Sequence, residues 1–483
     1  MQMPESELKN KTAKGLLWGG MSNGVQQLLN LFFGIFLARL LSPEDYGMVG
    51  MLTIFSVIAG SLQDSGFSSA LINRNDGDDK EVVWSSVFWF NIVVSAIIYI
   101  ILFFSAPLIA DFFRTPQLVK LARFVFLGFF FSSFGCTQNA YFMKHLLIKK
   151  KSMAIITAQL ISGITGVILA SRGYAYWGLA VQSVLYILTV QILYWILSPW
   201  HPSFKFSITP IREMFPFSCK LLVTNVFTNV NNNIFSVLLG RFYTKKEVGD
   251  YTQANKWNAM SYGIISGMVS GVSQPVLASV NDDQERQLRI LRKMVRFTAF
   301  LSFPAMFGLA LIAPEFITIA ITDKWAESSM ILRILCIGGA FIPISQLFGS
   351  LLISKGKSDI FMLSTITFSL LQIAILLALR CFGILAMVGA YAVLNIVWVG
   401  VWHLFVKRQT GYTLWNMMKD ILPFLGISGI VMVLTLLITN QIQSIYLTFV
   451  CKITLATSFY FLIMRLLNAK VLKESLDYLL KRR

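Results

Sequence analysis

The sequence has 483 residues, of which 56% are hydrophobic and only 13% are charged, and its mean hydropathy is +0.67. These values exclude an ordinary soluble protein. The net charge of +18 would suggest nucleic-acid binding in a soluble chain. Here it is better explained by basic loops on one side of a membrane, so no nucleic-acid partner is predicted.

In chain order, apolar stretches of about 20 residues or more, each long enough to cross a bilayer, follow one another with short polar breaks. The prediction is an all-α integral membrane protein with about 14 transmembrane helices. The expected helices lie near residues 16–40, 46–70, 82–106, 121–143, 153–171, 175–197, 216–240, 250–277, 296–320, 330–354, 359–379, 384–406, 420–439 and 444–467.

The distribution of basic residues predicts the orientation. Roughly 27 Lys and Arg lie in the two termini and in alternate loops, and about 11 lie in the opposite loops. Cytoplasmic loops of membrane proteins carry the excess of basic residues. Both termini are therefore expected in the cytoplasm.

An internal repeat divides the chain. The stretch from Arg39 to Gly47 and the stretch from Arg241 to Gly249 share an Arg, two bulky residues, a Ser or Thr, an acid and a Gly. They are about 202 residues apart, and a second echo matches Leu121, Arg123 and Gly128 to Ile331, Arg333 and Gly338. Because this offset spans an even number of helices, it predicts two parallel six-helix halves. The predicted divisions are residues 1–200, residues 201–410, and residues 411–483 with the last two helices.

Rows of amides mark two of the expected helices. The first row is Asn23, Gln27 and Asn30, and the second, at equivalent positions of the repeat, is Asn225, Asn229 and Asn232. Their spacing of three and four residues puts each row on one helix face. Buried amides often hydrogen-bond helices to each other. The interpretation we favour is a hydrated cavity, in which the amides bind sugar hydroxyls.

Few ionisable residues lie inside the expected spans, and each is a functional candidate because charge is costly in a bilayer. They are Asp64, Lys220, Lys256, Glu315 and Lys452. Lys220 and Lys256 are candidate cavity cations. Asp64 and Lys452 are candidates for an ion pair or for coupling, and Glu315 is expected to reach water.

No enzyme or metal site is predicted. The three histidines, His145, His201 and His403, lie far apart in the sequence at expected helix ends. The sequence has no P-loop, so ATP is not expected to be the direct energy source. We expect no catalytic residues, no metal and no cofactor.

One segment resembles a known family. Leu37-Ala-Arg-Leu-Leu-Ser-Pro-Glu-Asp-Tyr-Gly47, followed by Asp64-Ser-Gly-Phe-Ser-Ser-Ala-Leu71, is similar to the start of bacterial polysaccharide flippases of the Wzx type. The likeness is strongest to the colanic acid (WzxC) kind. These proteins belong to the multidrug/oligosaccharidyl-lipid/polysaccharide (MOP) exporter superfamily, and the resemblance covers essentially the whole chain.

The resemblance implies two six-helix bundles in a V around a central cavity, with two further helices forming a lipid-facing groove. It also implies alternating access coupled to a gradient of H⁺ or Na⁺. The implied cargo is an undecaprenyl-pyrophosphate-linked oligosaccharide for lipopolysaccharide, capsule or exopolysaccharide, and membrane lipids and polysaccharide polymerase machinery are the implied partners. The motif residues Arg39, Gly47, Arg241 and Gly249 are expected at the outer gate.

Two alternatives stay open. A peptidoglycan-precursor flippase of the MurJ type has the same superfamily and helix number, but its cavity is expected to be richer in arginine. A polytopic O-antigen polymerase or ligase typically has a large outer loop with catalytic Arg and His. The longest expected outer segment here, about Pro107 to Lys120, is short and contains no His.

Overall fold

The computed structural model describes residues 5–64, 67–74, 79–281, 283–467, 469 and 471–474. Within these ranges the side chains of some helical residues lie outside the description, among them Asp64 and Lys220. The fold consists of two compact units, residues 1–249 and 250–483. Each unit is a bundle of helices, and no strand occurs in the described ranges.

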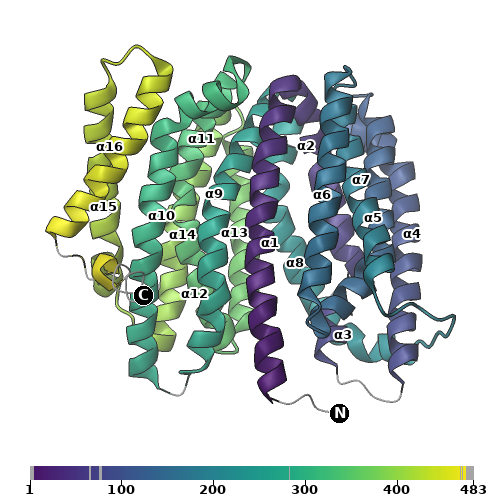
Figure 1. The fold of residues 1–483 in the computed structure, drawn as a ribbon. Coiled ribbons are helices and arrows are strands. Elements are labelled where there is room, and N and C mark those ends of the chain that lie inside the picture. Colours follow the sequence, from purple (N-terminus) through teal and green to yellow (C-terminus); the bar gives the residue numbers. More distant parts are fainter. Residues whose placement is uncertain are drawn as a thin grey trace. The chain divides into compact units, whose positions relative to one another are not determined.

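The first unit holds eight helices and the start of a ninth (Figure 1). They are α1 (Glu5–Leu40), α2 (Pro43–Asp64), the short α3 (Phe67–Asn73), α4 (Lys80–Phe112), α5 (Leu118–Lys144), α6 (Ile148–Ser171), α7 (Tyr176–Leu197), α8 (Thr209–Phe242) and the beginning of α9 (Lys245–Ala278). Helix α6 packs between α1 and α7, and α5 packs against α4 and α7. Helix α8 packs against α2, α3 and α4, which is why contacts group it with the first unit.

The second unit holds most of α9 and the remaining helices. These are α10 (Gln284–Ile321), the 3₁₀ turn η1 (Asp323–Trp325), α11 (Ala326–Gly339), α12 (Ile342–Ser354), α13 (Ser358–Ala378), α14 (Ile384–Thr410), α15 (Leu414–Thr439) and α16 (Ile445–Leu466). The boundary at Gly249 differs from the predicted division at residue 200. The latter concerns the sequence repeat and stays a prediction.

All fourteen expected segments coincide with long helices or helix pairs, since α2 with α3 and α11 with α12 each fill one expected span. In the described part of the chain, eleven segments meet both the length and the hydropathy expected of a membrane span. Helices α1, α8 and α9 are among the longest but are not among the eleven. The all-α membrane fold is confirmed, whereas the exact number of fourteen spans stays a prediction.

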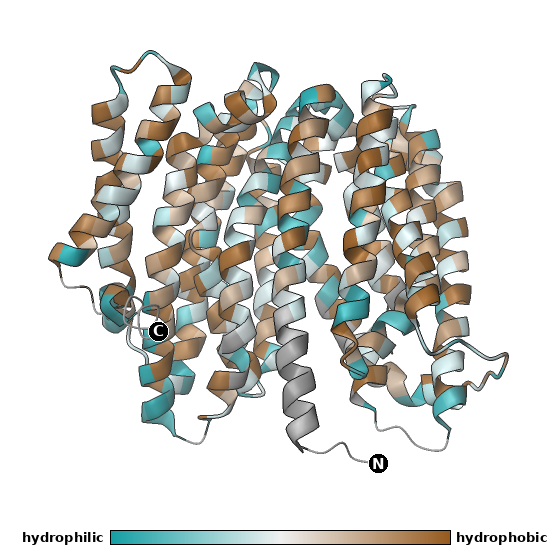
Figure 2. Ribbon diagram, in the orientation of Figure 1, coloured by the Kyte–Doolittle hydropathy of each residue, from teal (hydrophilic) through white to brown (hydrophobic). Residues whose placement is uncertain are grey.

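The surface of α4 is adapted to lipid. Val93, Ile97, Ile100, Phe104 and Leu108 recur at helical spacing, and each is between 53% and 72% exposed. A continuous apolar stripe of this length would be unfavourable in water. In Figure 2 apolar residues dominate the helices, and hydrophilic residues gather at helix ends and connecting loops.

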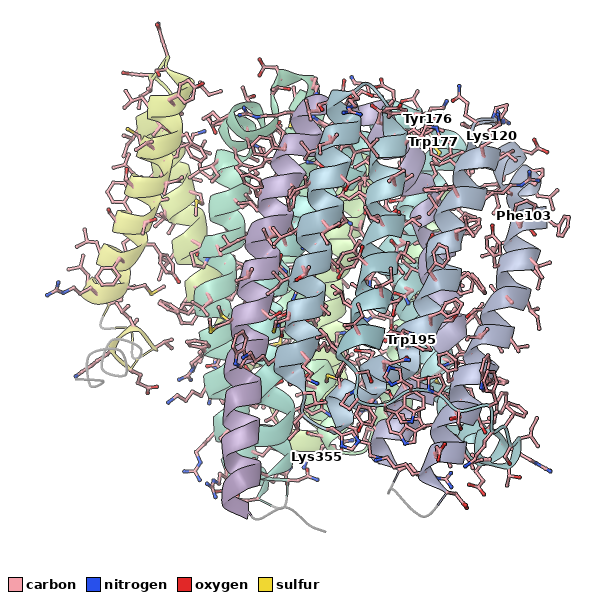
Figure 3. The ribbon with its side chains drawn as sticks, turned by 45° about the vertical axis from the view of Figure 1, so that its right-hand side comes forward. Phe103, Lys120, Tyr176, Trp177, Trp195 and Lys355 are labelled. Atoms are coloured by element: carbon pink, nitrogen blue, oxygen red, sulfur yellow. The ribbon has the colours of Figure 1, made fainter. Side chains whose placement is uncertain are left out.

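Aromatic residues mark both ends of α7. Figure 3 shows Tyr176 and Trp177 near one end of the unit and Trp195 toward the other. Trp177 and Trp195 are 18 residues apart, which corresponds to about 27 Å along a helix. Tyr and Trp are enriched at the two interfaces of a hydrocarbon layer about 30 Å thick. The protein is therefore a multi-pass membrane protein.

Close helix packing explains why the second repeated pattern has a glycine, Gly128 in one half and Gly338 in the other. A methyl group added at Gly128 on α5 would press on Val184 and Ile187 of α7. A methyl group added at Gly338 on α11 would lie 2.7 Å from the Cα of Ala392 on α14. In each repeat, therefore, a glycine lets the fourth expected span approach the sixth closely.

A buried carboxylate ties α15 to α10. Asp420, whose side chain is fully buried, accepts hydrogen bonds from Arg292 Nε at 2.8 Å and Arg296 Nε at 2.6 Å. The Tyr412 hydroxyl donates to the same carboxylate at 3.0 Å. Because its charge and its hydrogen-bonding capacity are satisfied, the carboxylate can be buried between the helices.

The predicted orientation can be tested with a native residue. Cys381 is exposed in the short connection between α13 and α14, which is expected on the outer side. A membrane-impermeant maleimide should label Cys381 in intact cells. In a chain without native cysteines, a cysteine at the exposed Gln284 should be labelled only after the cells are opened. The reverse pattern would contradict the orientation.

Candidate functional site

The two repeated motifs form the same structure, a tight corner between two helices. In the first corner, between α1 and α2, the Ser42 backbone N–H donates to Asp45 Oδ2 at 2.9 Å, and the Asp45 N–H donates to Ser42 Oγ at 3.3 Å. In the second, between α8 and α9, Thr244 and Glu247 make the equivalent bonds at 2.9 and 3.3 Å. Each is a capping box that begins a helix.

The two corners interlock through their glycines. A methyl group added at Gly47 would collide with the carbonyl oxygen of Lys245, and one added at Gly249 would collide with that of Pro43. Lys245 and Pro43 are themselves equivalent in the repeat. The contact is therefore reciprocal, and it requires glycine at both positions because a backbone carbonyl cannot move aside as a flexible side chain can.

The motif arginines lie near the ends of α1 and α8. Arg241 Nη1 donates to the Phe112 carbonyl at 2.6 Å, and its guanidinium lies 5.1 Å from the centre of the Phe112 ring. Arg39 is exposed at the end of α1. Gly47 and Gly249 thus bring the two corners into contact within the first unit, and the expectation that Arg39, Gly47, Arg241 and Gly249 form an outer gate stays a prediction.

Two of the six predicted amides hold helices together. Gln159 Nε2 on α6 donates to Asn30 Oδ1 at 2.9 Å, and Asn229 Nδ2 donates to Ser61 Oγ on α2 at 2.6 Å. Hydrogen bonds of this kind join helices in membranes. For these two residues the structure shows the helix-joining role.

The side chains of the other four amides are exposed or half-buried. Asn23, Asn225 and Asn232 are exposed, and Gln27 is half-buried. Asn23 lines a cavity of about 540 Å³ between α1 and α6, together with Gly19, Gly20, Ser22 and Gln26. Most of the cavity wall is apolar, and Asn23, Ser22 and Gln26 supply polar groups that can bond to water or to sugar hydroxyls.

Of the charged residues predicted inside the spans, the structure describes the side chain of Lys256 but not those of Asp64 and Lys220. Lys256 on α9 is half-buried, and its Nζ lies 5.8 Å from the centre of the Trp257 ring. The side chains of Asp64 and Lys220 lie outside the described residues. The structure therefore describes no contact for either of them.

Lys452 and Glu315 form an ion pair inside the second unit. Lys452 Nζ on α16 donates to Glu315 Oε1 on α10 at 2.6 Å and to the Leu311 carbonyl at 3.3 Å. Their side chains are only 6% and 13% exposed. The expectation that Glu315 reaches water is not met, because Lys452 compensates its charge within the bundle.

A cation that the sequence analysis did not single out lies in the first unit. Lys151, one turn into α6, lines both the cavity beside α1 and a second cavity of about 410 Å³. In the sequence it belongs to the run Lys149–Lys151, which lies between the helices expected near 121–143 and 153–171 and counts among the basic residues of the loops. Nothing in that run distinguishes a lysine that faces the bundle.

The fold and these features define a multi-pass membrane protein of the transporter type. The chain belongs to the family described as "Polysaccharide biosynthesis protein", which matches residues 36–330. Among its relatives, an "Uncharacterized membrane protein in cps region" of Klebsiella pneumoniae is 27% identical over 79% of each chain. The "Lipopolysaccharide biosynthesis protein WzxC" of Escherichia coli is 24% identical over 73% of this chain and 72% of the relative. The predicted Wzx-type resemblance is confirmed.

Solved structures share the fold. "Lipid II flippase MurJ, inward closed conformation" superposes with a TM-score of 0.77 at 18% identity, over 93% of this chain and 99% of that one. A "multidrug resistance MATE family transporter of the MOP superfamily" in an inward-facing conformation gives 0.64 at 17% identity, over 82% and 94%. These likenesses establish the MOP-type fold.

Proposed function

We propose that this protein is a flippase that moves an undecaprenyl-pyrophosphate-linked oligosaccharide across the bacterial inner membrane for lipopolysaccharide, capsule or exopolysaccharide synthesis. Its relatives are named for lipopolysaccharide, teichuronic acid and succinoglycan biosynthesis or transport, which favours polysaccharide precursors over lipid II as cargo. In this proposal the protein is a transporter and not an enzyme, both termini are cytoplasmic, and a gradient of H⁺ or Na⁺ drives alternating access.

The observation that carries the proposal is the contrast between the helices. The exposed face of α4 from Val93 to Leu108 is apolar, whereas α1 and α8 expose the amides Asn23, Asn225 and Asn232 in addition to apolar residues. Polar side chains within a membrane protein belong on surfaces that water or a polar ligand reaches. A sugar headgroup presents hydroxyls that both donate and accept hydrogen bonds, as carboxamides do.

The amides can be tested in matched pairs. Asn225→Leu should lower export severalfold without lowering the melting temperature, because the Asn225 side chain is exposed. Asn229→Leu should instead lower the melting temperature, since it removes the hydrogen bond to Ser61 between α8 and α2. Export should be measured as surface polysaccharide per amount of membrane-inserted protein. Normal export by Asn225→Leu combined with Asn23→Leu would count against an amide-lined path.

The function itself is tested by depletion. Cells that lose this protein should accumulate lipid-linked oligosaccharide that sugar-oxidising periodate cannot reach in intact spheroplasts. Cells complemented with the wild-type chain should not. If depletion leaves both the surface polysaccharide and the lipid-linked pool unchanged, the proposal is wrong.

A further inference from the structure

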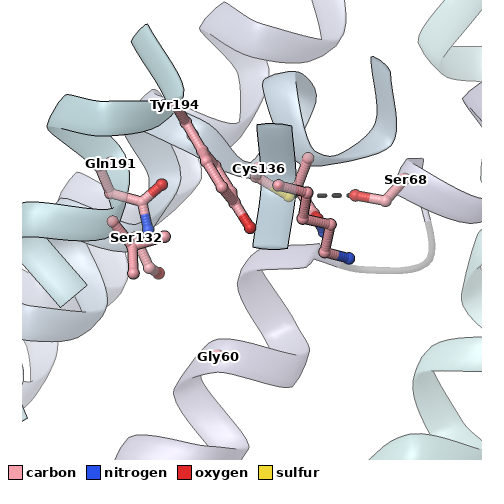
Figure 4. A pocket seen from close by; sticks show the side chains of 10 residues that line it. Gly60, Ser68, Ser132, Cys136, Gln191 and Tyr194 are labelled. Atoms are coloured by element: carbon pink, nitrogen blue, oxygen red, sulfur yellow. Dashed lines mark hydrogen bonds between the residues drawn. The ribbon is translucent and has the colours of Figure 1, made fainter. Parts of the chain in front are cut away.

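An open pocket with both polar and apolar side chains in its wall lies among helices of the first unit (Figure 4). It measures about 410 Å³, within the range of about 300–1,000 Å³ that is usual for small-molecule sites. Tyr194 and Gln191 of α7 line one side, and Ser68 and Cys136, joined at 3.1 Å, line another. Helices α2, α3, α5, α6 and α7 all contribute to its wall.

Among the residues that the structure describes, Lys151 is the only basic one that lines this pocket. Its two neighbours are occupied elsewhere, since Lys150 Nζ donates to the Leu197 carbonyl at 3.0 Å and Lys149 Nζ lies 5.2 Å from the Trp18 ring centre. The Lys151 backbone N–H donates to the Leu147 carbonyl at 3.3 Å, but within the described ranges the Lys151 side chain makes neither an ion pair nor a hydrogen bond. An ammonium group that is partly removed from water without a counter-ion is costly, so the site is suited to an anion that is not part of the protein.

Two carboxamide oxygens in the pocket wall accept no hydrogen bond from the described residues. Gln191 Oε1 and Asn139 Oδ1 are buried and have no hydrogen-bond partner among the described residues. The Tyr194 ring lies beside Gln191 (Figure 4) and presents an apolar face. Both carboxamides line the pocket and can donate or accept hydrogen bonds to ligand hydroxyls, and the carbon face of a sugar ring would pack on the tyrosine.

We propose that this cavity is a binding site for an acidic sugar, that is, a sugar residue bearing a carboxylate or a phosphate. Lys151 pairs with the anion, and Asn139, Gln191 and Tyr194 contact the ring and its hydroxyls. The inference rests on the proposed function, because the acidic sugar that the pocket recognises would be part of the transported oligosaccharide. It assigns cargo selection to a pocket within one bundle.

Binding to the purified full-length protein tests the site without any transport assay. The probes are glucuronate, glucose 1-phosphate, inorganic phosphate and glucose, measured by calorimetry or thermal shift in detergent. Glucuronate or glucose 1-phosphate should bind with a dissociation constant on the order of 1 mM. Inorganic phosphate and glucose should bind about tenfold more weakly or not at all, because each lacks one of the two recognised features.

Variants identify the residues. Lys151→Gln should weaken binding of the acidic sugar about tenfold or more, Lys151→Arg should retain most of it, and Lys149→Gln should bind like wild type. Gln191→Leu should weaken the acidic sugar a fewfold. The unliganded melting temperature of Lys151→Gln should equal or exceed that of wild type, which separates lost binding from lost folding.

Three results would overturn the proposal: no binding of either acidic sugar, equal binding by inorganic phosphate alone, or unchanged binding by Lys151→Gln. If export proceeds in cells while the purified protein shows one of these results, the acidic-sugar site is wrong and the flippase function stands. If the acidic sugars bind through Lys151 but cargo is not moved, the proposed function fails and the site stands.

Discussion

Gly249→Ala should reduce polysaccharide export at least tenfold while the protein still inserts in the membrane. The added methyl group would collide with the Pro43 carbonyl across the two interlocked corners. The two corners could then no longer contact each other, and the conformation in which they are in contact would be lost. Gly47→Ala should have the same effect, because its methyl group would collide with the equivalent carbonyl of Lys245.

Two glycines on the same helix provide the matched control. Methyl groups added at Gly267 or Gly271 of α9 would meet no atom within 4 Å. Alanine at these positions should leave export unchanged and should stabilise the helix slightly, by about 0.5–1 kcal/mol. Export should be compared at equal amounts of membrane-inserted protein. Normal export by Gly249→Ala would show that the contact between the corners is not needed for transport.

Lys452→Met should destabilise the protein by about 3–5 kcal/mol, because it leaves the Glu315 carboxylate buried without its cation. The double variant Lys452→Met with Glu315→Gln should recover most of this loss, since neither charge is then present. Thermal unfolding in detergent measures both. A double variant no more stable than the single one would contradict a structural ion pair.

The same pair of variants separates structure from coupling. If the ion pair only fastens α16 to α10, the double variant should export at a rate close to wild type. A double variant that is stable but does not export would assign the pair to ion coupling instead.

Much of the fold could be predicted because the bilayer constrains it. All fourteen expected segments coincide with long helices or helix pairs, since a helix is the simplest way to satisfy the backbone within lipid. The corners were predictable as a repeat, and their Ser42–Asp45 and Thr244–Glu247 spacing also carries the signature of a capping box. The contacts of Gly47 with Lys245 and of Gly249 with Pro43 could not be predicted, because each joins residues about 200 positions apart.

The candidate site was only partly predictable. Spacing places Asn23 and Asn30 on one face of α1, but it does not reveal that Asn30 bonds to Gln159 while Asn23 is exposed. Lys452 could be recognised as a charge in a span, but its partner Glu315 lies on another helix. In the sequence, Lys151 is one of three consecutive lysines in an expected loop. Only the packing of α6 against its neighbours turns it toward a cavity.

The most direct test of the flippase function uses the purified protein in liposomes that contain undecaprenyl-pyrophosphate-linked oligosaccharide. Periodate added outside oxidises only sugars on the outer leaflet. With the wild-type chain, the protected inner pool should become accessible over time, and with the Gly249→Ala variant it should stay protected. Equal protection with and without the wild-type chain, under an imposed H⁺ or Na⁺ gradient, would contradict the proposed function.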